Sequence, residues 1–192
     1  MLLYLIRHGE SIANRDRCHG SWMQVPLSPA GMEQAKQAGE KLKDIPFDRV
    51  FASDLKRAMQ TCEIAMPGRA YETSSLLREI NCGSLDGKTR DECRAEYGDL
   101  YTGSLERQDY TPFGGENRDM LQKRVSGFLK QLELADADTV AVFGHFGTLR
   151  SVAELVLQVP SLKGRLLCPN GCISIFELRE GVWRLNAWNI QV

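Results

Sequence analysis

Long apolar runs and targeting signals are missing from this sequence of 192 residues. No stretch approaches the roughly 20 apolar residues of a membrane-spanning helix. The N-terminus has no basic segment followed by a long apolar core and a small-residue cleavage site, as a signal peptide would. We therefore expect a cytoplasmic protein that has no membrane partner.

An excess of charge of one sign is also missing. The chain has 24 basic and 25 acidic residues, which gives a formal net charge of -1. A balance of this kind provides no broad positive field to attract nucleic acid, so we expect no nucleic-acid partner and only a local site for anions. No long heptad pattern or large apolar stripe is legible, which leaves a homodimer open.

The six cysteines form no C-x-x-C motif and no cluster with histidine, so a zinc site is not expected. Cys168 and Cys172 are close enough in the sequence to meet. Pro169, Asn170 and Gly171 between them indicate a turn. The sequence therefore favours free thiols beside a loop.

Apolar periodicity predicts alternating strands and helices. Continuous apolar runs predict buried strands at residues 2–6, 50–52 and 140–143, with a weaker strand at 70–73. Helical spacing predicts helices at residues 28–46, 54–66, 117–135 and 148–157, the second capped by Ser53 or Asp54. A glycine-containing turn predicts a C-terminal hairpin of strands 173–178 and 182–188.

The segment from Cys82 to Arg118 interrupts this regularity with seven glycines and prolines, and only residues 91–97 have a helical pattern. We interpret it as a lid-like insertion around residues 82–118. The remaining elements predict one α/β domain over residues 1–192. It would have three layers, with helices on both faces of a mostly parallel central sheet.

Two of the three histidines follow predicted strands directly. Ligands of open α/β sheets bind beyond the carboxyl ends of the strands, so His8 and His145 should lie at the site. Neutral imidazole can attack phosphorus. Arg7 beside His8, and Arg57 in the first turn of the second helix, would supply positive charge to a phosphoryl group.

Several motifs, in order along nearly the whole chain, resemble the histidine phosphatase superfamily. The segment LIRHGES at residues 5–11, followed by Asn14, is similar to the opening motif of this family, which includes phosphoglycerate mutases and α-ribazole phosphatases. Later similar blocks are residues 26–31 (PLSPAG), 53–58 (SDLKRA), 77–80 (LREI), 114–116 (GGE) and the segment around His145. The combination is specific, whereas R-H-G alone would be weak.

The resemblance implies a role for each matching residue. His8 would become the phosphohistidine, and Glu79 would act as general acid and then as general base. The phosphoryl group would be bound by Arg7, Asn14, Arg57 and His145. Gly20 and Ser21 match a short loop that contacts substrate in many relatives. No metal and no cofactor are implied, because arginine and histidine supply the positive charge.

The resemblance also implies a metal-independent phosphoric monoester hydrolase that acts on a small phosphorylated substrate. Phosphoglycerate mutase-type transfer is the first alternative, although mutases have longer chains. A non-catalytic binding protein for phosphorylated ligands is the second. Leu85 and Phe146 depart from the family pattern, which puts the fit of the substrate in question more than the chemistry.

The identity of the ester stays open, as does the orientation of the four cations Lys88, Arg90, Arg94 and Arg107. His19 is expected either to line the entrance or to be solvated.

Overall fold

The computed structural model describes residues 1–191, so Val192, the last residue of the predicted domain, lies outside the described residues. One six-stranded sheet has the order β3-β2-β4-β1-β5-β6. The strands are β1 (Leu2–Arg7), β2 (Arg49–Ser53), β3 (Glu72–Ser74), β4 (Thr139–Gly144), β5 (Ile173–Arg179) and β6 (Val182–Ile190). The first four run parallel, and the β5–β6 hairpin is antiparallel. These pairings confirm the predicted mostly parallel sheet and C-terminal hairpin.

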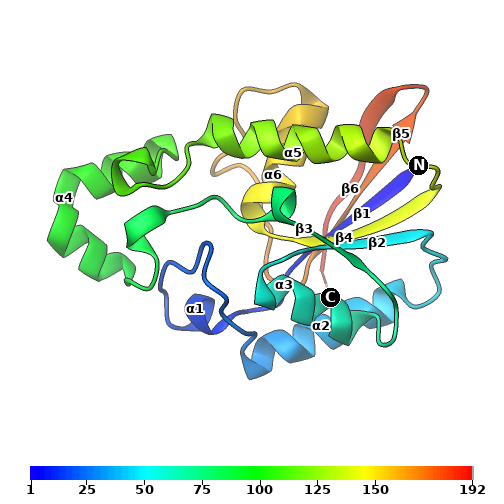
Figure 1. Cartoon of the computed structure of the whole chain (residues 1–192), viewed down its shortest axis with the longest axis horizontal. Coiled ribbons are helices and arrows are strands. Elements are labelled where there is room, and N and C mark those ends of the chain that lie inside the picture. Colours follow the sequence, from blue (N-terminus) through cyan, green and yellow to red (C-terminus); the bar gives the residue numbers. More distant parts are fainter. Residues whose placement is uncertain (192) are drawn as a thin grey trace.

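Helices cover both faces of this sheet. The helices are α1 (Ile12–Arg15), α2 (Pro29–Leu42), α3 (Lys56–Ala65), α4 (Arg90–Arg107), α5 (Arg118–Glu133) and α6 (Phe146–Leu157). Figure 1 shows α2 and α3 on one side of the sheet and α5 and α6 on the other. The predicted three-layer α/β fold is therefore confirmed. No helix within residues 1–191 is both long enough and apolar enough to cross a bilayer.

The apolar run of β1 serves two separate cores. Successive strand side chains point to opposite faces of a sheet. Leu3 and Leu5 accordingly belong to the apolar cluster that includes α5 and α6, whereas Tyr4 and Ile6 pack in the cluster beneath α2 and α3. Burial on both faces is the physical reason that this strand is apolar from Leu2 to Ile6.

The ends of the parallel strands bring distant polar residues together. Arg7 at the end of β1 pairs in register with Gly144 at the end of β4, and β2 beside β4 ends at Ser53. The residues that follow these ends, His8 and His145 among them, therefore meet at one edge of the sheet.

The segment around residues 82–118 contains more helix than predicted. Helix α4 runs over 18 residues, and its path breaks at Gly98, where φ is +49°. Thr89 and Glu92 form a capping box that starts it. Most of its residues are polar, and the few that pack in the apolar core, Cys93, Tyr97, Tyr101 and Leu105, lie on both sides of the break at Gly98, so the helical pattern is weak. Figure 1 shows α4 and α1 beyond the end of the sheet; that the segment acts as a lid stays a prediction.

The predicted cap of α3 is wrong. The helix begins at Lys56, after Leu55, and no side chain caps it. The Ser53 hydroxyl instead lies 2.8 Å from a ring nitrogen of His145. The Asp54 carboxylate accepts two hydrogen bonds from Arg78. Both polar groups are used by tertiary contacts rather than by the helix.

Candidate active site

A cavity of about 420 Å³ opens where β1 and α3 meet the segment 82–118. Seven of the eight site residues predicted from the sequence line it: Arg7, His8, Asn14, Gly20, Ser21, Arg57 and Glu79. His145 is the exception, because its side chain is fully buried and is not part of the wall. It lies against His8 instead, with ring centroids 5.1 Å apart.

The hydrogen bonds of His8 define its reactive nitrogen. Nδ1 lies 2.6 Å from the carbonyl oxygen of Gly9, which can only accept, so Nδ1 carries the proton. Nε2 therefore keeps its lone pair, and Nε of Arg57 lies 3.3 Å from it. Burial lowers the pKa of His8 well below the ordinary value, and the charges of Arg57 and Arg7 lower it further. At neutral pH His8 is thus an uncharged imidazole whose Nε2 can attack an electrophile.

Arg57 is the buried cation beside this nitrogen. Its guanidinium donates to the carbonyl oxygens of Ser21 at 2.9 Å and of Met23 at 3.3 Å. Burial lowers its pKa to about 10, which still leaves it protonated at neutral pH. These two carbonyls hold the fork of donors in place before any ligand arrives.

Arg7 is held by a different set of contacts. Its guanidinium donates to the carbonyl oxygen of Cys168 and lies over the ring of Phe146, 5.7 Å from the ring centre. Arg150 lies 5.3 Å from the centre of the same ring. Phe146 therefore contacts two of the cations, which a glycine at that position could not do.

His145 has one nitrogen with a partner and one without. Nε2 lies 2.8 Å from the hydroxyl of Ser53, whereas Nδ1 is buried and has no hydrogen-bond partner within residues 1–191. If the Ser53 hydroxyl donates to Nε2, Nδ1 carries a proton that a phosphoryl oxygen could accept. The pKa of His145 is also lowered, first by burial and then by Arg57, so the ring is neutral.

Glu79 is fixed by backbone donors. One carboxylate oxygen accepts from the N–H of Ile80 at 2.8 Å and the other from the N–H of Gly147 at 3.1 Å. A Cβ atom at position 147 would lie 2.0 Å from the Glu79 carboxylate, so only glycine allows this approach.

The G-G-E block at residues 114–116 helps to hold the backbone of the Glu79 segment in place. Glu116 forms a bidentate pair with Arg124 at 2.9 Å, and both side chains are largely buried. Arg124 in turn donates to the carbonyl oxygens of Arg78 and Glu79. A buried bidentate pair of this kind fixes orientation more than it adds stability.

Sequence patterns did not single out part of the cavity wall. Gln108, Tyr110, Arg150 and Lys163 line it although no motif marks them. His19 also lines it, and its Nε2 lies 2.8 Å from the hydroxyl of Tyr101.

The four cations whose orientation was open divide into two pairs. Arg90 and Arg94 line the cavity. Lys88 and Arg107 do not, and Lys88 bonds to Glu96 and Tyr97 instead.

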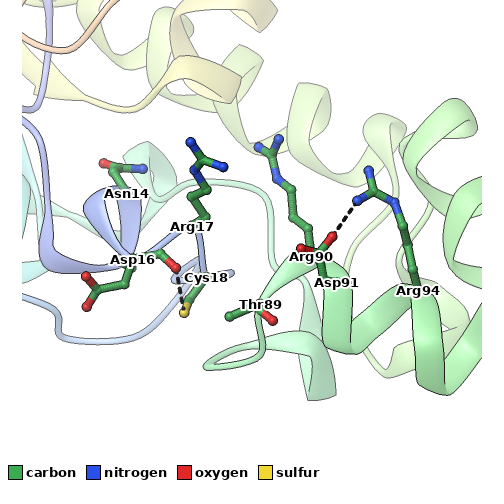
Figure 2. Close-up of a pocket in the computed structure, with 9 residues that line it drawn as sticks. Asn14, Asp16, Arg17, Cys18, Thr89, Arg90, Asp91 and Arg94 are labelled. Carbon is green, nitrogen blue, oxygen red and sulfur yellow. Dashed lines mark hydrogen bonds and ion pairs between the residues drawn. The ribbon is translucent and has the colours of Figure 1, made fainter.

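A second cavity of about 480 Å³ adjoins the first. The two share the lining residues Ala13, Asn14, Cys18, Arg90 and Arg94. Figure 2 shows Arg17, which follows α1, and Arg90 and Arg94 of α4 extending to the same side. The position of His8 is therefore continuous with a space bordered by three arginines.

The profile of the histidine phosphatase superfamily (branch 1) matches residues 3–191. The chain belongs to this superfamily. It is 33% identical over 200 residues to a 2,3-bisphosphoglycerate-dependent phosphoglycerate mutase of Bradyrhizobium sp. (strain BTAi1 / ATCC BAA-1182), covering 97% of this chain and 92% of that one. The structure of the alpha-ribazole phosphatase from Shigella flexneri superposes with a TM-score of 0.90 at 26% identity, covering 98% of this chain and 96% of that one.

A third relative resembles only part of the chain. Fructose-2,6-bisphosphatase TIGAR B of Danio rerio is 36% identical over 137 residues, which cover 68% of this chain. The chain spans 52% of the length of that relative. Together the similarities show a phosphatase of this superfamily, and the relatives differ in the substrates that their names give.

Within residues 1–191, no group of three or more histidine, cysteine or acidic side chains is arranged to hold a metal ion. The positive charge around His8 comes from arginine side chains instead.

Leu85, one of the two departures from the family pattern, is fully buried in the apolar cluster.

Proposed function

We propose that this histidine phosphatase hydrolyses a small phosphate monoester through a covalent phosphohistidine on His8, without a metal ion. The observation that carries the proposal is the state of His8. Its Nδ1–H is bound to the Gly9 carbonyl, its Nε2 is unprotonated, and the guanidinium of Arg57 is next to that nitrogen. A neutral nucleophile beside a fixed cation is what attack on a phosphate dianion requires.

In the first step, Nε2 of His8 attacks phosphorus in line with the leaving oxygen. The negative charge on the equatorial oxygens is stabilised by Arg7 and Arg57, whose guanidinium groups are already oriented by backbone carbonyls. His145 would donate through Nδ1, for which residues 1–191 offer no other partner. Asn14 lines the same cavity and would also bind the phosphoryl group, whereas Gly20 and Ser21 form the adjacent wall and would contact the rest of the ester.

Glu79 performs the two proton transfers in this proposal. It protonates the leaving alkoxide as the P–O bond breaks, and the resulting carboxylate then takes a proton from the water that attacks the phosphohistidine. The N–H groups of Ile80 and Gly147 hold the carboxylate form in position for the second transfer. For the first transfer, the Glu79 carboxyl group must carry a proton when the substrate is bound.

The arginines of the adjoining cavity favour an ester that has a second negative group. No ion pair within residues 1–191 involves Arg17 or Arg90, and Arg94 pairs only with Asp91, an exposed carboxylate. Arg17 lines only the adjoining cavity, and Arg90 and Arg94 line both cavities, so we assign all three to binding rather than to the transfer. They would bind a carboxylate or a second phosphate of the same molecule.

Phosphate release from a panel of small phosphate esters tests the proposal, with chelator present throughout. We expect release by the wild-type protein, no release by His8→Ala, and no effect of the chelator. Loss of activity on chelation would contradict the metal-free mechanism. Wild-type release no higher than that of His8→Ala would contradict hydrolysis and favour transfer between phosphorylated acids.

A further inference from the structure

The turn between α6 and β5 contains two thiols in contact. The Sγ atoms of Cys168 and Cys172 are 3.2 Å apart, and both side chains are buried. Gly171 has φ +82°, a conformation that glycine adopts without strain, and the N–H of Cys172 donates to the carbonyl of Pro169. The turn that the sequence indicated therefore brings the two sulfurs together rather than keeping them apart.

This turn is hydrogen-bonded to the backbone of the proposed nucleophile. The side chain of Asn170 donates to the carbonyl oxygen of His8 at 3.0 Å, and the N–H of Gly171 donates to the same oxygen at 3.2 Å. A change in the shape of the turn therefore acts on the backbone of His8.

Arg7 is held by the two cysteine residues themselves. Its guanidinium donates to the carbonyl of Cys168, and its backbone N–H donates to the carbonyl of Cys172 at 3.0 Å. The position of the Arg7 side chain consequently depends on the distance between the two cysteines.

The pair also has the features of a reactive thiol site. A cavity of about 450 Å³ reaches Cys168, and its wall includes Arg7 and Phe146. The hydrogen bond between the thiols lowers the pKa of Cys172 and raises the pKa of Cys168, and the charge of Arg7 lowers the pKa of both against the effect of burial. Nearby positive charge and a partner thiol are the conditions under which a cysteine reacts with peroxide and is then resolved as a disulfide.

We propose that Cys168 and Cys172 form a reversible disulfide when the protein meets hydrogen peroxide, and that this disulfide displaces Arg7 and weakens phosphate binding. One sulfur, as thiolate, attacks a peroxide oxygen; the O–O bond breaks, a sulfenic acid forms, and the departing hydroxide takes a proton to become water. The second sulfur, on losing its proton, attacks the sulfenic sulfur, and a second water leaves. Two electrons pass from the sulfurs to the peroxide, and a dithiol reverses the change.

Disulfide formation draws the two cysteines together, and in this proposal the turn that carries them moves with them. The bonded sulfurs are about 2.05 Å apart, so the two side chains must approach by about 1 Å from their separation of 3.2 Å. Misplacement of a binding group by about 1 Å can lower a rate by on the order of 100-fold. The effect on turnover rests on the proposed phosphatase activity, whereas formation of the disulfide does not.

One tryptic peptide reports the modification. Cleavage after Arg165 and Arg179 releases residues 166–179 (LLCPNGCISIFELR), which contain both cysteines of the pair and no other cysteine. The folded protein is treated with dilute hydrogen peroxide, unfolded, alkylated and digested. We expect this peptide to lose the mass of two hydrogen atoms and to resist alkylation until a dithiol is added.

Phosphatase activity on nitrophenyl phosphate is measured in the same samples. We expect at least a roughly 10-fold loss of kcat/KM on oxidation, recovered by the dithiol. Cys172→Ser should show no dithiol-reversible loss. Cys18→Ser, which removes a cysteine on the cavity wall, should still show the dithiol-reversible loss of activity. Each variant is compared with its own untreated sample.

Two results would overturn the inference: a peptide 166–179 that keeps two alkylatable thiols in peroxide-treated protein, or a disulfide that forms while turnover is unchanged. The mass measurement uses the wild-type protein and therefore holds even where a serine variant fails to fold. An inactive but peroxide-sensitive wild type would contradict the proposed function and leave the disulfide supported.

Discussion

The proposed phosphate end of the cavity and its arginine-rich outer wall are built in opposite ways. His8 and Arg57 are 4% and 3% exposed, and both are held by backbone carbonyls. His8 follows strand β1, and Arg57 lies in helix α3 after strand β2. Arg17 and Arg90 are exposed and follow or begin peripheral helices, and Figure 2 shows their side chains extending without a drawn partner.

The difference indicates how chemistry and substrate choice are divided in this molecule. A buried charge that is oriented in advance acts strongly and costs little reorganisation during the reaction. An exposed charge is screened by water and salt and contributes modestly to affinity. Changes at the buried end should therefore alter the rate of chemistry, whereas changes on the outer wall should alter which ester binds.

The largest effect is expected from Glu79→Gln, which keeps the shape of the side chain but cannot transfer a proton. Phosphorylation by an alkyl phosphate should slow by roughly 10²- to 10⁴-fold, because its alkoxide needs a proton to leave. Nitrophenyl phosphate has a good leaving group and should still phosphorylate His8, giving a burst of nitrophenol before slow hydrolysis. Stopped-flow kinetics with both esters measures this.

Glu40→Gln, on the exposed surface of α2, is the control for removal of one carboxylate. Equal slowing of phosphorylation with both esters would show that another residue protonates the leaving group.

A smaller effect is expected from Arg90→Gln or Arg94→Gln on the outer wall. KM for a sugar bisphosphate should rise by roughly 10-fold, and KM for nitrophenyl phosphate by less than about 2-fold, with kcat unchanged for both. The rise should shrink in high salt, because exposed charges are screened.

Arg184→Gln, an exposed change on β6, serves as the matched control for loss of a positive charge. If both esters bind equally less well in the wall variants, the arginines act on the transferred phosphate itself and the proposed division is wrong.

The smallest effect is on stability at mildly acid pH. The pKa values of His8 and His145 are lowered in the folded protein, so below about pH 6.5 the unfolded chain binds protons that the folded chain cannot. The free energy of unfolding should therefore fall from pH 6.5 to pH 5.5, by at most about 1.4 kcal/mol for each histidine. Urea unfolding of the wild type and of His8→Gln at several pH values measures this. The free energy of unfolding should depend less steeply on pH in the variant, and equal slopes would contradict a lowered pKa of His8.

The positions of the buried residues could be predicted from the sequence because strong local patterns determine them. Continuous apolar runs marked β1 and β4, and the polar residue after each run was bound to lie at the carboxyl edge of the sheet. His8 and His145 were placed in this way. The structure adds that His145 is buried behind His8 rather than on the cavity wall.

The outer wall could not be predicted because its residues are brought together only by tertiary contacts. Helix α4 is mostly polar and is broken at Gly98, so its length and the position of Arg90 on the cavity wall left only a weak periodic signal. The cap of α3 was wrong for a related reason: Ser53 and Asp54 are good capping residues locally, but His145 and Arg78 compete for them from segments distant in the sequence.

Trapping of the phosphorylated protein tests the central claim most directly. The protein is mixed with a ³²P-labelled ester, quenched in alkali, which preserves phosphohistidine, and digested with trypsin. We expect label on the peptide of residues 8–15 (HGESIANR) and no label in His8→Ala. Steady phosphate release with this peptide unlabelled would contradict a phosphohistidine on His8.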